Sequence, residues 1–294
     1  MPNLKELKNR KRSILATKKI TSAMKMIAAA KLKKAQAQAY AARPYIELMS
    51  KMLSSLLARV QDPKQLPALL VGQNSSHSHM LVLVTSNRGL SGGFNSSLVR
   101  LAEKHINELQ KDGKEVKIYC IGRKGKEQLA RRYQPLIFQI VEALDKPRFY
   151  DASRIAQELL RLFEEQAFDT CSIIYNKFIS ALTQKTTLSS LIPFKIEQEH
   201  NSQPSTIVQR APYTYEPNEA EVLTQLLSKN FSVQIYHTLL ENTASEQGAR
   251  MSAMDTATNN ANDMLRKIDL TYNQTRQACI TKELIEIISG AEAL

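Results

Sequence analysis

The chain has 294 residues, of which 43% are hydrophobic and 23% charged, a composition that excludes collagen-like and wholly disordered proteins. The net charge is +12 at pH 7, and residues 1–60 account for all of the excess, with 14 basic and two acidic side chains. The rest of the chain is neutral overall. We therefore expect the N-terminal segment to face something acidic.

The three cysteines, Cys120, Cys171 and Cys279, lie far apart in the sequence, which favours neither a disulfide framework nor a zinc site and suits a reducing compartment. No stretch approaches the roughly 18 uninterrupted apolar residues of a membrane span. We do not expect the chain to be inserted in a bilayer. The absence of a transit peptide favours a bacterial protein, and a processed organellar chain is the alternative.

Proline and glycine are nearly absent from both ends of the chain. Between Pro2 and Pro63 the only proline is Pro44, and from residue 218 to residue 289 there is one glycine, Gly248, and no proline. This predicts two very long helices, with a kink or break near Pro44 in the first. Helices of such length need a partner in water.

Both terminal segments carry a seam of small, hydroxyl and apolar residues at alternating steps of three and four, the spacing of a coiled coil. In the first segment the seam residues are Ile14, Thr17, Thr21, Met24, Ala28, Leu32 and Ala35. In the second they are Met251, Met254, Thr258, Ala261, Leu265, Ile268, Tyr272, Thr275 and Cys279. Residues 220–294 carry nine acids and six bases, so we expect the two segments to pair as an antiparallel coiled coil.

The middle of the chain alternates between predicted strands and predicted helices. Strands are expected at 80–86, 115–121, 136–141 and 170–178, and helices at 94–109, 124–132 and 151–166. This order predicts a parallel sheet with right-handed crossovers. A further strand at 187–196 is expected to be antiparallel. The predicted fold class is therefore α/β: a long antiparallel coiled coil of the N- and C-terminal helices plus a Rossmann-like α/β domain with a mostly parallel sheet. The predicted domains are 1–60, 77–216 and 218–289.

Residues 86–95, SNRGLSGGFN, form a glycine-bearing loop between a predicted strand and a predicted helix. Backbone N–H groups in such a loop can bind a phosphate. The loop lacks both the Lys-Ser/Thr ending of a P-loop and the GxGxxG spacing of a dinucleotide site. A structural turn or a contact surface is the favoured interpretation, with phosphate binding as the alternative.

Candidates for catalysis or metal binding are weak. His77 and His79 could share a metal ion, but no cysteine or carboxylate stands beside them, so a loop with two histidines is favoured. The sequence contains no nucleophile elbow, no HExxH motif and no plausible Ser-His-Asp set, and catalysis by this chain is not expected.

The basic N-terminal helix has three interpretations. It could follow nucleic-acid phosphates, present a solvated face, or bind inside an acidic protein cavity. Aromatic side chains that could stack on bases are absent before Tyr40, which argues against single-strand binding.

Three motifs resemble those of the γ subunit of F-type ATP synthases of the bacterial type. They are residues 18–31 (KKITSAMKMIAAAK), the glycine loop, and residues 245–254 (SEQGARMSAM) with 272–284 (YNQTRQACITKEL). The order of helix, α/β domain and helix extends the resemblance over the whole chain. Asn87 stands where the family usually has Asp, and Ser91 stands where many members have Cys.

The resemblance implies a central rotor stalk that couples ion-driven rotation of the membrane c ring to ATP synthesis or hydrolysis at the β subunits. Its implied partners are the α and β subunits of the catalytic hexamer, the ε subunit and the c ring, with no nucleic acid. ATP, ADP and Mg²⁺ would be bound by α and β, so this chain would hold no cofactor or metal. The implied location is peripheral, on the cytoplasmic face of the bacterial inner membrane, the mitochondrial matrix side being less favoured.

The resemblance also implies contact residues. Met24 and Lys25 correspond to positions that meet a β subunit, although ordinary seam packing is an equal alternative for Met24. Tyr213 and Glu216, in the segment YTYEP, correspond to the contact with the c ring. Four further residues correspond to contacts of the upper shaft with the hexamer: Arg276, Gln277, Thr281 and Glu283. A basic coiled-coil protein that binds nucleic acid is the alternative function, and a nucleotide-binding α/β enzyme is a third.

Overall fold

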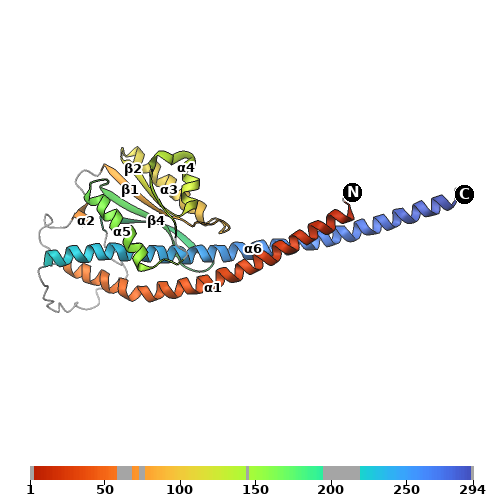
Figure 1. Ribbon diagram of the computed structural model, residues 1–294, viewed down its shortest axis with the longest axis horizontal. Helices are drawn as coiled ribbons and strands as arrows, with labels where there is room; N and C mark the ends of the chain where they lie inside the picture. Colours follow the sequence, from red (N-terminus) through yellow and green to blue (C-terminus); the bar gives the residue numbers. More distant parts are fainter. Residues whose placement is uncertain (1–2, 58–67, 73–76, 144–145, 195–218, 293–294) are drawn as a thin grey trace, which may run out of the picture. The chain divides into compact units, whose positions relative to one another are not determined.

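Five strands form one sheet in the order β3-β2-β1-β4-β5. Strands β1, β2 and β4 of this sheet are labelled in Figure 1. The computed structural model describes residues 3–57, 68–72, 77–143, 146–194 and 219–292. The strands are β1 Ser78–Val84, β2 Glu115–Ile121, β3 Ile137–Val141, β4 Thr170–Phe178 and β5 Gln184–Ile192. Strands β1 to β4 pair in parallel, and β5 runs antiparallel to β4. The predicted fold class is confirmed, including the antiparallel last strand.

The helices follow the predicted order. They are α1 Leu4–Leu57, α2 Ala68–Val71, α3 Phe94–Lys111, α4 Arg123–Tyr133, α5 Phe149–Glu164 and α6 Glu219–Glu292, with a 3₁₀ turn, η2, at Gln134–Leu136. The single turn α2 was not predicted, because four residues are too few to show a period. The last strand begins at Gln184 rather than near residue 187, since its first half is polar and carries no apolar run.

Both faces of the sheet are covered, which explains why β1 is an uninterrupted apolar run. Met80, Val82 and Val84 belong to a core shared with α5 and α6. Leu81 and Leu83 point to the opposite face and belong to a core shared with α3 and α4. Successive side chains of a strand therefore serve two different cores.

Helix α1 continues through Pro44, so the break expected there is absent. A proline inside a helix removes one backbone hydrogen bond and crowds the preceding turn. Beyond the proline, however, Met49 and Leu53 are 5% and 0% exposed and pack with Leu223 and Leu227 of α6. This apolar contact offsets the local cost of the proline.

The chain divides into two compact units, and both long helices contribute to each of them. One unit comprises Met1–Ala30 and Arg250–Leu294, and the other comprises Lys31–Ala249. The first unit contains the terminal helical pair, and the second contains the sheet and the remaining parts of α1 and α6. The three domains expected from the sequence remain a prediction.

Candidate functional site

The terminal unit is an antiparallel helical pair, as three contacts between α1 and α6 establish. The hydroxyls of Thr21 and Thr258 lie 2.8 Å apart. Lys25 Nζ lies 2.6 Å from Asp255 Oδ1, and Lys11 Nζ lies 2.6 Å from Asp269 Oδ1. Residue numbers fall along α1 as they rise along α6, which is the register of antiparallel helices.

The predicted seam is largely correct. All nine seam residues of α6, from Met251 to Cys279, are buried or half-buried. Of the seven seam residues of α1, only Thr17 is exposed. Its hydroxyl donates to the Ser13 carbonyl of the preceding turn. Small residues at the contact, such as Thr21 and Ala28, are buried together with the larger apolar side chains of Met254, Leu265 and Ile268.

Met24 and Lys25, the predicted β-subunit contacts, are both half-buried. The Lys25 side chain is 45% exposed although its ammonium binds Asp255. The sequence pattern did not single out three neighbours that are far more exposed: Ile20 at 60%, Met26 at 65% and Ile27 at 59%. Apolar residues off the seam of a basic helix are the signal that could have identified this surface.

The four predicted upper-shaft residues, Arg276, Gln277, Thr281 and Glu283, are all exposed. Every residue from 281 to 289 is exposed as well. This end of α6 includes five large apolar side chains that are 46% to 68% exposed: Ile280, Leu284, Ile285, Ile287 and Ile288. The terminal turns of α6 thus present apolar and polar side chains together. The predicted c-ring contacts Tyr213 and Glu216 lie outside the described residues.

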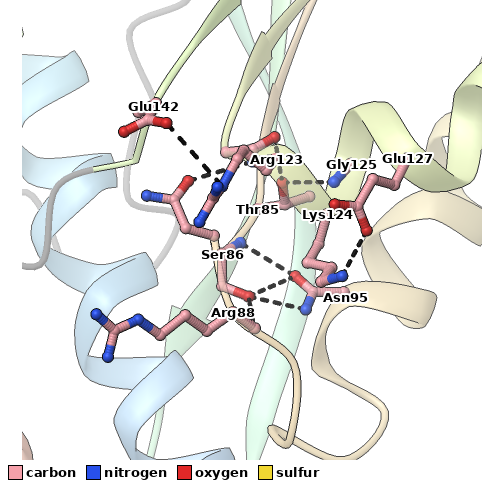
Figure 2. Close-up of polar contacts among 11 residues, drawn as sticks. Thr85, Ser86, Arg88, Asn95, Arg123, Lys124, Gly125, Glu127 and Glu142 are labelled. Atoms are coloured by element: carbon pink, nitrogen blue, oxygen red, sulfur yellow. Dashed lines mark hydrogen bonds and ion pairs between the residues drawn. The ribbon is translucent and has the colours of Figure 1, made fainter.

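The glycine loop is closed by its own polar groups (Figure 2). Asn95 Oδ1 accepts from the Ser86 backbone N–H at 3.0 Å, and Asn95 Nδ2 donates to Ser86 Oγ at 2.8 Å. The Thr85 hydroxyl accepts from the backbone N–H of Gly125 at 2.9 Å, which ties the end of β1 to the start of α4. The side chain of Arg88 points away from this network (Figure 2), whereas its backbone carbonyl accepts from Ser86 Oγ. These contacts favour the interpretation of the loop as a structural turn.

Asn87 shows why an amide suits a position where Asp is usual in the resembling family. Its Nδ2 donates to the Ala143 carbonyl at 2.7 Å. Its Oδ1 accepts from the backbone N–H groups of Ala143 at 3.1 Å and Arg123 at 3.2 Å. A carboxylate could accept but could not donate, so Asn87 joins the loops after β1, β2 and β3 more completely than Asp would.

His79 lies in strand β1, not in the loop that was expected from the sequence. His79 is 7% exposed, and its ring nitrogens lie 2.7 Å from the hydroxyls of Thr170 and Ser172. Burial, with smaller effects of His105 and Lys114, lowers the pKa of His79 to about 4. Within the described ranges, no group of three or more His, Cys, Asp or Glu side chains could hold a metal ion.

Cys120 and Cys171 are both buried. Burial raises the pKa of Cys120 to about 12 and raises the pKa of Cys171 as well, so neither forms the thiolate needed for nucleophilic chemistry. Cys279 is half-buried in the seam. Among the helices that the structure describes, none is long and apolar enough to cross a membrane.

Comparisons with known proteins agree with this geometry. The family model for ATP synthase matches residues 3–294. The ATP synthase gamma chains of Parvibaculum lavamentivorans and Mesorhizobium japonicum are each 48% identical to this chain, over 296 and 298 residues, and each match covers 100% of both chains.

Solved structures with the same fold include two mitochondrial ATP synthases. The central stalk and c ring of Tetrahymena thermophila gives a TM-score of 0.59 at 25% identity, covering 81% of this chain and 99% of the other. The rotor of Euglena gracilis gives a TM-score of 0.67 at 20% identity, covering 94% of this chain and 98% of the other.

Proposed function

This chain belongs to the gamma-chain family of ATP synthases, and we propose on that premise that it is a central rotor stalk. It couples ion-driven rotation of the membrane c ring to ATP synthesis or hydrolysis at the β subunits. The observation that carries the proposal is the 48% identity over the full length of both chains. The nucleic-acid-binding alternative has no support in these comparisons.

The helical pair has the physical properties that a shaft requires. Two antiparallel helices resist bending more than one, and their contact in the terminal unit combines hydroxyls and small residues with buried apolar side chains such as Leu265 and Ile268. The exposed apolar and basic side chains of α1 and α6 are then available to surrounding subunits. Such a surface lets one shaft meet different partners as it turns.

The chemistry belongs to other subunits. This chain is a non-catalytic subunit, and we propose that ATP, ADP and Mg²⁺ are bound by the α and β subunits alone. In support, the side chains of Ser86 and Asn95 in the glycine loop bond to each other, and Thr85 at the end of β1 bonds to the start of α4.

The contact residues remain proposals. We assign Met24 and Lys25 to the β-subunit contact, supported by the partial exposure of both side chains. We assign Arg276, Gln277, Thr281 and Glu283 to the hexamer contact, supported by their exposure. The assignment of Tyr213 and Glu216 to the c ring rests on the sequence motif.

The proposed partners are the α and β subunits, the ε subunit and the c ring, and nucleic acid is not among them. We place the complex at the cytoplasmic face of the bacterial inner membrane, where this chain is peripheral. The bacterial origin of the relatives supports that location over a mitochondrial one.

Affinity capture tests the proposal. A tagged copy of the chain is purified from detergent-solubilised membranes of its source, and the eluate is analysed by mass spectrometry and an ATPase assay. We expect α, β and ε subunits with ATPase activity, whereas the chain purified alone is inactive. Recovery of nucleic acid or ribosomal proteins without these subunits would contradict the proposal.

A further inference from the structure

Strand β4 is longer than its neighbour β1, and this leaves part of one edge without a strand. The last pair between β1 and β4 joins Leu83 and Ile174. Strand β4 continues to Phe178. The backbone groups of Asn176 and Phe178 that face the β1 side therefore need other partners, because an unpaired buried backbone group is costly.

Helix α6 supplies those partners from its side chains. The backbone N–H of Asn176 donates to Asn242 Oδ1 at 3.1 Å, and Ser245 Oγ donates to the Asn176 carbonyl at 2.8 Å. Glu241 lies near the same edge: burial raises its pKa, and the Phe178 backbone lowers it in part. Side chains on one face of α6 thus bond to the part of β4 that extends beyond its pairing with β1.

This contact is buried and extends beyond one strand. Asn176 is 2% exposed, Asn242 4% and Ser245 0%. The Asn176 side chain donates from Nδ2 to the Phe94 carbonyl at 3.4 Å, and its Oδ1 accepts from the Thr186 hydroxyl at 2.8 Å. Asn176 therefore links α6 to the start of α3 and to β5.

Gly248 continues the same face of α6, three residues after Ser245. A Cβ atom at Gly248 would lie 3.1 Å from the Ala181 carbonyl oxygen, in the turn between β4 and β5. The helix and the β4–β5 hairpin are therefore in close contact at this point. Ser245 and Gly248 both belong to the SEQGARMSAM motif, for which no contact was predicted from the sequence.

We infer that Asn242 and Ser245 of α6, together with Asn176 of β4, form the joint that transmits torque between the sheet and the shaft helix. The inference rests on the proposed rotor function. Apolar contacts are non-directional, so the apolar packing of α6 on the sheet does not by itself fix the helix against sliding or rotation. Hydrogen bonds are directional, and a buried donor or acceptor that is left without its partner costs the full desolvation free energy of that group. These three are positioning residues and take no part in the chemistry.

Hydrogen–deuterium exchange on the full chain tests the joint itself. The variants are Asn242→Ala and Ser245→Ala, and the matched control is Thr243→Ala, whose hydroxyl donates to the Leu239 carbonyl of its own helix. We expect the Asn176 amide to exchange about tenfold faster in Asn242→Ala, the equivalent of one net hydrogen bond. Ser245→Ala should raise it less, since Ser245 binds the carbonyl, and Thr243→Ala should leave it unchanged. Equal exchange in Asn242→Ala and the control would overturn the inference.

The torque role is tested in the assembled ATP synthase, with the hexamer fixed and a probe on the c ring. We expect the Asn242→Ala, Ser245→Ala double variant to hydrolyse ATP at the wild-type rate while the angular variance of the stalled probe rises about twofold, because the directional contacts of the joint are lost. Unchanged variance in an assembled double variant would overturn the torque role. If the wild-type complex does not rotate, the proposed rotor function is wrong. The exchange experiment would still test whether Asn242 and Ser245 hold α6 against β4.

Discussion

The ammonium of Lys25 lies 2.6 Å from the Asp255 carboxylate, and this ion pair joins α1 to α6 one turn from the Thr21–Thr258 hydroxyl contact. The two side chains are 45% and 48% exposed. An ion pair so open to water contributes at most about 1 kcal/mol to stability. The terminal helical pair is therefore held mainly by its seam, where Met254, Leu265 and Ile268 are buried.

Replacing Asp255 by Asn should lower the free energy of unfolding by less than about 1 kcal/mol at low salt, and the difference should vanish at high salt because exposed charges are screened. Chemical denaturation of the full chain at two ionic strengths measures this. Asp263→Asn is the control, since Asp263 pairs with Arg266 of its own helix. A salt-independent loss of several kcal/mol would show that the pair is a principal fastening of the shaft.

Replacing Arg276 and Gln277 together by Ala should change the free energy of unfolding by less than about 0.5 kcal/mol, because both side chains are exposed. Coupled ATP synthesis by inverted membrane vesicles should nevertheless fall several-fold, since hydrogen bonds to the hexamer are lost. Arg266→Ala, at a position whose side chain is 83% exposed, serves as the control. Wild-type synthesis by the double variant would refute the assignment of these residues to the hexamer contact.

Replacement by alanine should destabilise the chain at Gly122, before α4, and have little effect at Gly89 in the glycine loop. Gly122 has φ of 105°, and a Cβ atom there would lie 2.3 Å from the Thr85 carbonyl oxygen. Gly122→Ala should therefore destabilise the chain by at least about 3 kcal/mol. A Cβ atom at Gly89 would meet nothing within 4 Å, so Gly89→Ala should stay within about 0.5 kcal/mol. Urea denaturation compares the two, and equal effects would contradict the described geometry.

His79 should make the chain less stable in mild acid. Its pKa is about 4 in the folded chain and 6.5 without burial, so the unfolded chain binds more protons between these values. Stability is then lost as the pH falls from about 6.5 toward 4. Between pH 7 and pH 5 the wild type should lose about 2 kcal/mol more than His79→Gln. Parallel pH profiles for the two chains, measured by chemical denaturation, would disprove this.

The scarcity of proline and glycine was sufficient to predict the two long helices, and periodicity was sufficient to predict the seam and the positions of the strands along the chain. Thr17 is on the seam spacing but is exposed, and its hydroxyl donates to the Ser13 carbonyl of its own helix. The continuity of α1 through Pro44 depends on Met49 and Leu53 packing against α6, residues that lie far away in the sequence. Local propensity cannot anticipate such a contact.

The site was predicted less completely. The motifs suggested Met24, Lys25, Arg276 and Gln277 as contacts, and these assignments stay predictions. No spacing rule connects Asn176 to Asn242, because the two belong to different elements and meet beyond the point where β1 stops pairing with β4. A weak signal was present in α6: polar residues such as Asn242 and Ser245 occupy positions that the structure buries. A buried polar residue in a helix requires a partner, and that requirement pointed to a contact without identifying it.

The most direct test of the rotor account is a single-molecule rotation assay. Lys111, exposed at the end of α3, is replaced by Cys and labelled with a probe, and the chain is assembled with the α and β subunits of its source on a surface. The account predicts that ATP drives continuous rotation of the probe in one direction. Assembled complexes that hydrolyse ATP while the probe stays fixed would contradict it.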